Sequence, residues 1–90
     1  MKIVSLRPEV AAFAQLMERQ LQAQDPERGS WRDREPDDLF NRLDGQVMRL
    51  RDALFGITGA GSPLTRTVNV ANYAMMLADV LGGLPSQEGF

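Results

Sequence analysis

The chain of 90 residues contains no cysteine and no histidine. These absences exclude disulfides, thiol nucleophiles and the usual ligands of structural zinc. Without histidine, any acid–base catalysis would have to depend on carboxylates. The sequence also has no apolar run near the roughly 20 residues of a membrane span, and residues 1–6 are too short for a signal peptide. We therefore expect a cytoplasmic protein that does not enter a membrane.

The chain also lacks a strong excess of charge of either sign. Ten basic and twelve acidic residues leave a net charge of −2. This balance has neither the basic footprint of a nucleic-acid binder nor the strong acidity of a DNA mimic, so nucleic acid is not an expected partner. A chain of this length forms one small domain, which buries only about 60% of the surface of its unfolded form.

Apolar residues recur at helical spacing in three segments, which predict helices at residues 8–24, 36–55 and 63–82. Each segment starts with a proline suited to the first helical turn, and Ser62 is a plausible cap for the third. Gly56 follows the second helix, and Gly82 and Gly83 end the third. Residues 25–35 read as an ordered polar loop, and residues 84–90 as a loose tail. The sequence predicts a single all-α domain over residues 1–90.

The predicted third helix is apolar on most of its sides between residues 68 and 81. Such a helix needs cover that one short chain can hardly supply. We therefore expect a homo-oligomer, either a dimer or a tetramer, that associates through the third helix.

Three stretches of the chain carry a family resemblance: FAQLME at residues 13–18, RGSW at 28–31 and VANYAMM at 70–76. In this order and spacing they resemble the MazG-like all-α nucleoside triphosphate pyrophosphohydrolases, in particular the small dATP/dGTP type found in phages and prophages. The resemblance spans roughly residues 6–81. It implies a MazG-like helical bundle and an enzyme ancestry.

The resemblance also implies a magnesium site, which members of the family build from an EExxE element on one helix and an ExxD element on the next. In this sequence those positions are occupied by Gly45, Gln46, Arg49, Arg66 and Asn69. Magnesium requires oxygen ligands and negative charge, and two arginines would repel it. We therefore expect no metal site, no catalytic residue and no cofactor.

The candidate ligand-binding residues are those that match or replace the family's site, namely Arg28, Trp31, Arg49, Arg66, Asn69 and Asn72. Four of them have an alternative interpretation. The arginines at 49 and 66 would grip phosphate together, or would pair with Asp44, Asp52 or Asp79 or face water. Trp31 would stack on a base or would be a hydrophobic plug. Asn72 would bond a ligand, or a neighbour across an oligomer interface.

The sequence thus favours a non-catalytic protein that acts by binding. The family's association with phages suggests an inhibitor or sequestering anti-defence protein, which would bind a host protein or hold a nucleotide or phosphate without metal. The alternative is an active nucleoside triphosphate pyrophosphohydrolase with an atypical metal site.

Overall fold

The structure is a computed structural model that describes residues 5–25 and 29–84. These residues form three α-helices, one short 3-10 helix and no β-strand. In chain order the elements are α1 (Pro8–Gln24), η1 (Ser30–Asp33), α2 (Pro36–Leu54) and α3 (Pro63–Val80). The prediction of an all-α chain with three main helices is confirmed.

The helices begin where local chemistry predicted. All three start with proline, whose missing N–H is not needed in the first turn. The hydroxyl oxygen of Ser62 accepts a hydrogen bond from the backbone N–H of Thr65 at 3.3 Å, which confirms this residue as the cap of α3.

The helix ends differ slightly from the prediction. α2 ends at Leu54 and α3 at Val80, so the predicted ends at residues 55 and 82 lay one and two residues too far along. Gly56 and Gly82 follow with φ angles of 74° and 75°, in the left-handed region that glycine adopts without strain.

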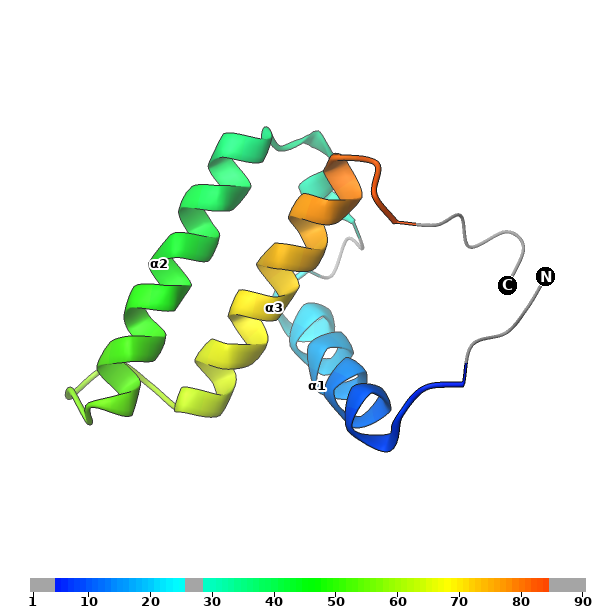
Figure 1. Cartoon of the computed structure of the whole chain (residues 1–90). Coiled ribbons are helices and arrows are strands. Elements are labelled where there is room, and N and C mark those ends of the chain that lie inside the picture. The colour runs from blue at the N-terminus through cyan, green and yellow to red at the C-terminus, as the bar shows by residue number, and fades with distance from the viewer. Residues whose placement is uncertain (1–4, 26–28, 85–90) are drawn as a thin grey trace.

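α3 is the central element of the fold. Figure 1 shows α2 running antiparallel along one side of α3, while α1 lies on the other side. The core lies mainly between α2 and α3, where Leu39 is completely buried and Ala53, Ala60 and Val68 are nearly so. Part of the apolar surface of α3 is therefore covered by α1 and α2 of the same chain. Association of copies through α3 stays a prediction.

The segment expected to be an ordered loop contains η1, which the sequence did not reveal. The carboxylate of Asp25 accepts hydrogen bonds from the backbone N–H of Gly29 at 3.0 Å and from the hydroxyl of Ser30 at 2.6 Å. Gly29 has a φ of 81°, which turns the chain into η1. Two side chains of η1 then hold it against α3, as described below.

Two predictions concern residues outside the described part of the chain: the candidate binding residue Arg28 and all but the first residue of the tail at 84–90. Within the described part, each helix is too short or too polar to cross a membrane.

Candidate functional site

Of the five positions that the resemblance singled out, Gln46, Arg66 and Asn69 meet between α2 and α3. The side-chain oxygen of Gln46 accepts hydrogen bonds from Arg66 at 3.3 Å and from the amide of Asn69 at 3.2 Å. Arg66 also donates to the backbone oxygen of Ala60 at 2.7 Å. Arg66 therefore ties the loop before α3 to the helix pair, in a contact that neither interpretation of this residue anticipated.

Arg49 does not join this cluster. Its side chain is exposed, and it makes no hydrogen bond or ion pair with any described residue. Arg49 and Arg66 line neither of the two pockets described below, so the structure does not bring them together as a phosphate grip. Arg49 instead faces water, which was one of the alternatives. A Cβ at Gly45 would meet open space, so packing does not require a glycine at this position.

The residues present at these positions do not fit a magnesium ion. The side-chain oxygen of Gln46 already accepts two hydrogen bonds, from Arg66 and from Asn69, and the first of these comes from a guanidinium group. The positive charge of Arg66 within the cluster opposes a divalent cation, which prefers carboxylates. The described residues also contain no group of three or more histidine, cysteine, aspartate or glutamate side chains placed to hold a metal.

Two asparagines of α3 are the most informative polar groups of the interior. Asn69 and Asn72 are only 5% and 3% exposed. The amide of Asn72 donates to the backbone oxygen of Met17 at 3.2 Å, which connects α3 to α1 within the chain. The side-chain oxygens of both asparagines are buried and have no hydrogen-bond partner among the described residues. Buried polar atoms in proteins are rarely left in this state.

Both asparagines line a pocket of about 180 Å³ between the end of α1, η1, α2 and α3. We call it the asparagine pocket. Trp31 and Tyr73 supply aromatic surface, and Leu21 and Met76 supply further apolar surface. The pocket therefore combines aromatic and apolar surface with two asparagine side chains, whose unpaired oxygens are themselves covered from solvent.

Charged groups of both signs border the asparagine pocket. Arg34 and Arg42 line it, and both bind the carboxylate of Asp38, at 2.9 Å and 3.1 Å. The hydrogen bond from Arg34, followed by that from Arg42, lowers the pKa of Asp38, and the carboxylate in turn raises the pKa of Arg42. This trio carries one net positive charge, which the Asp25 carboxylate at the pocket wall offsets. The site is nearly neutral.

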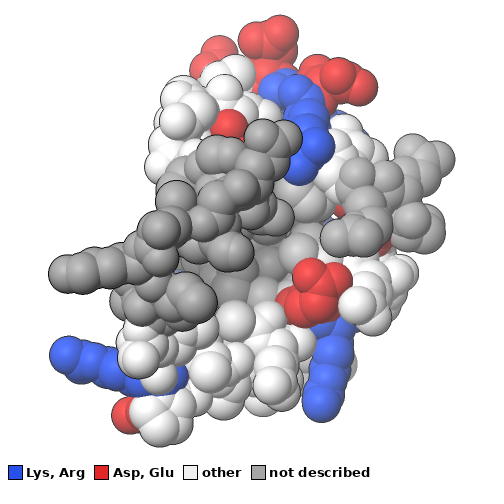
Figure 2. Space-filling model, turned by 90° about the vertical axis from the view of Figure 1, so that its right-hand side faces the viewer, with Lys and Arg blue, Asp and Glu red and all other residues white. Residues whose placement is uncertain are grey.

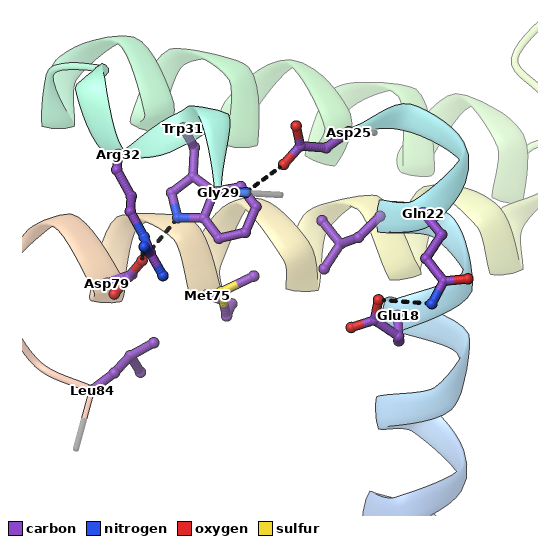
Figure 3. A pocket seen from close by; sticks show the side chains of 10 residues that line it. Glu18, Gln22, Asp25, Gly29, Trp31, Arg32, Met75, Asp79 and Leu84 are labelled. Atoms are coloured by element: carbon purple, nitrogen blue, oxygen red, sulfur yellow. Dashed lines mark hydrogen bonds and ion pairs between the residues drawn. The ribbon is translucent and has the colours of Figure 1, made fainter. Parts of the chain in front are cut away.

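A larger pocket adjoins the asparagine pocket, and Leu21, Asp25 and Trp31 line both. The second pocket, of about 660 Å³, lies between α1, η1 and α3 and is shown in Figure 3. There the indole N–H of Trp31 donates to Asp79 at 3.0 Å, and Arg32 forms an ion pair with the same carboxylate at 3.5 Å. Asp79 thus pairs with η1, and not with Arg49 or Arg66. Glu18 and Asp25 make the remaining wall acidic, which disfavours phosphate.

Sequence reasoning placed Trp31, Asn69 and Asn72 at the candidate site, and the structure brings all three to one pocket. It missed Arg34, Arg42 and Tyr73. The spacing of Asp38 and Arg42, four residues apart on a helix, predicts their ion pair. No signal in the sequence showed that this pair would lie beside the two asparagines.

The chain matches no protein-family model, no curated protein and no solved structure at a significant level. Its surface adds little that is specific to one class of partner. On the face shown in Figure 2, the described residues place acidic and basic side chains among many uncharged ones, without a broad basic patch.

Proposed function

We propose that this protein is a non-catalytic binder built on a MazG-like scaffold, and that the asparagine pocket holds the base of a nucleotide without a metal ion. The observation that carries the proposal is the pair of unpaired side-chain oxygens on Asn69 and Asn72. A buried acceptor without a partner costs about 1–3 kcal/mol. Both oxygens are covered from solvent, so a ligand in the pocket reaches them when the two side chains turn toward it, and a hydrogen bond donated to each oxygen then removes that cost.

The shape and polarity of the pocket favour a heterocycle. Nucleobases carry N–H donors at their edges, which suit the two asparagine oxygens, and flat faces, which suit Trp31 and Tyr73. A volume of about 180 Å³ is below the range of roughly 300–1,000 Å³ that encloses a drug-sized ligand. The pocket therefore suits one base, with the sugar and phosphates outside it.

The lost metal site supports binding without hydrolysis. A nucleoside triphosphate pyrophosphohydrolase of the resembled family uses carboxylate-bound magnesium, whereas Arg66 and Gln46 bond each other at these positions. A protein that recognises a nucleotide and leaves it intact acts by sequestering it or by signalling its presence to a partner. Such a role fits the proposed phage or prophage origin and an anti-defence activity against a host component.

A thermal-shift screen tests this proposal. The purified protein is heated with mono-, di- and triphosphates of the common nucleosides and deoxynucleosides, each in EDTA and in magnesium. A ligand that binds only the folded protein raises its melting temperature. We expect at least one nucleotide to raise it equally in both conditions. The shift should vanish in Asn72→Leu and persist in the control Asn41→Leu, which makes the same change at an exposed position of α2.

Two results would count against the proposal. If no nucleotide raises the melting temperature, the asparagine pocket does not serve a base, and the protein acts on another class of partner. If stabilisation requires magnesium, and a coupled assay detects pyrophosphate released from the same nucleotide, the protein is an active pyrophosphohydrolase with an atypical metal site.

A further inference from the structure

The side of α2 that faces away from α3 is a second unexplained surface. Figure 1 shows α2 at the edge of the molecule, and among the described residues its main packing is against α3. Three large apolar side chains on this side are exposed, Phe40 (56%), Val47 (42%) and Met48 (54%), as is Phe55 (76%), which directly follows the last residue of α2 and continues its hydrogen bonding to Arg51. At about 100° per residue, they lie within roughly 100° of arc, so they form one face. We call it the outer face of α2.

Two opposite charges lie within this apolar face. Asp44 and Arg51 are exposed, and neither forms an ion pair with any described residue. They are seven residues apart on α2, beyond the three- or four-residue spacing at which helix neighbours pair. Each is therefore an unpaired charge surrounded by apolar groups, with its complement two turns away.

The order of residues on the outer face is symmetric in chemical character. Around a midpoint between Val47 and Met48, Asp44 lies three residues before Val47 and Arg51 three residues after Met48. Phe40 lies seven residues before Val47, and Phe55 seven residues after Met48. A two-fold axis through this midpoint would place Phe40 of each copy beside Phe55 of the other. It would also place Asp44 of each copy beside Arg51 of the other. Such self-complementarity is the requirement of an isologous interface.

We infer that the outer face of α2 binds the same face of a second copy of this chain, with the two α2 helices antiparallel. Asp44 of each copy then pairs with Arg51 of the other, and the apolar side chains lose their exposure to water. The contact is centred on one helix from each copy, so its stability depends strongly on the two ion pairs.

Charge reversal gives a test that separates this contact from any other. In Asp44→Arg, both cross-helix pairs become arginine with arginine. In Arg51→Asp, both become aspartate with aspartate. We expect sedimentation velocity to show a concentration-dependent dimer for the natural chain, and each variant alone to dimerise about tenfold more weakly or not at all. When the two variants are mixed, every pair is again arginine with aspartate, and a heterodimer should form.

The matched control is Arg49→Asp. Arg49 is exposed on the same helix but lies two residues from Arg51, about 200° around the axis and off the outer face. This variant should dimerise like the natural chain. Restoration by mixing also shows that the two variants are folded. A monomeric natural chain at every concentration would overturn the inference, as would a dimer that survives both reversals or mixed variants that stay apart.

Discussion

Replacing Asn72 by leucine should make the protein more stable while abolishing ligand binding. Leucine has nearly the shape of asparagine and no polar atoms. The change removes two opposing contributions at once: the hydrogen bond to the backbone oxygen of Met17 and the unpaired side-chain oxygen.

The expected magnitude follows from these two contributions. The hydrogen bond at 3.2 Å stabilises the folded protein by about 1 kcal/mol, and the buried unpaired oxygen destabilises it by about 1–3 kcal/mol. Met17 lies inside α1, where its carbonyl takes part in the helical bonding pattern, so the substitution does not leave that oxygen bare. The net gain in the free energy of unfolding is about 1 kcal/mol, which raises the melting temperature of a domain this size by about 4–8 °C.

Thermal and urea denaturation of the unliganded protein measure this gain, with Asn41→Leu as the control for the same change in an exposed position. Gains of stability at the expense of function are typical of residues kept for binding. A loss of about 1 kcal/mol or more in Asn72→Leu would refute the reasoning, because it would show that the side-chain oxygen is well satisfied in the free protein and awaits no ligand.

Three further substitutions test the structure around the site. Trp31→Phe keeps an aromatic side chain but removes the indole N–H that bonds Asp79, so urea denaturation should show a loss of about 1–2 kcal/mol; an unchanged value would mean that η1 is not held by this bond. Asp38→Asn tests an acid effect. Arg34 and Arg42 lower the pKa of Asp38 below its ordinary value of 3.8, so its carboxylate stabilises the folded state above that pH, and this contribution is lost as the pH falls through the lower folded pKa. Stability measured against pH should fall less steeply at the acid end in the variant, and equal slopes would contradict the pairing. Ser62→Ala removes the cap of α3 and should cost about 0.5–1 kcal/mol in urea, at the low end for a cap because the bond is 3.3 Å long; no loss would show that the cap contributes nothing.

The positions of the helices were predictable because their signals are local. A proline at the first position, the Ser62 cap and a following glycine act within one turn of the chain, so they can be read without knowledge of tertiary structure. η1 escaped prediction because it depends on the carboxylate of Asp25 folding the loop back on itself.

The candidate site was predictable only in part. The resemblance brought Gln46, Arg66 and Asn69 together, and they do meet, because residues of α2 and α3 that are 20 and 23 positions apart face each other across the helix pair. Which arginine turns inward was not predictable. Arg66 reaches a backbone oxygen that the loop before α3 presents, whereas Arg49 has no such partner among the described residues and faces water.

The expectation of an oligomer rested on the apolar surface of the third helix, whereas the inferred dimer contact lies on the outer face of α2. α3 lies between α1 and α2, whereas Phe40 on α2 and Phe55 just after it are exposed. Hydrophobic pattern alone shows that a helix has apolar faces. It does not show which of them the rest of the chain will cover.

The most direct test of the proposed binding site is an NMR titration of the isotopically labelled protein with a nucleotide in EDTA, following the side-chain amide signals of Asn69 and Asn72 and the indole N–H of Trp31. A base held in the asparagine pocket predicts that these three signals shift together and saturate, while the side-chain amide of the exposed Asn41 stays in place. If every nucleotide leaves the signals of Asn69 and Asn72 unmoved, the asparagine pocket is not a nucleotide site.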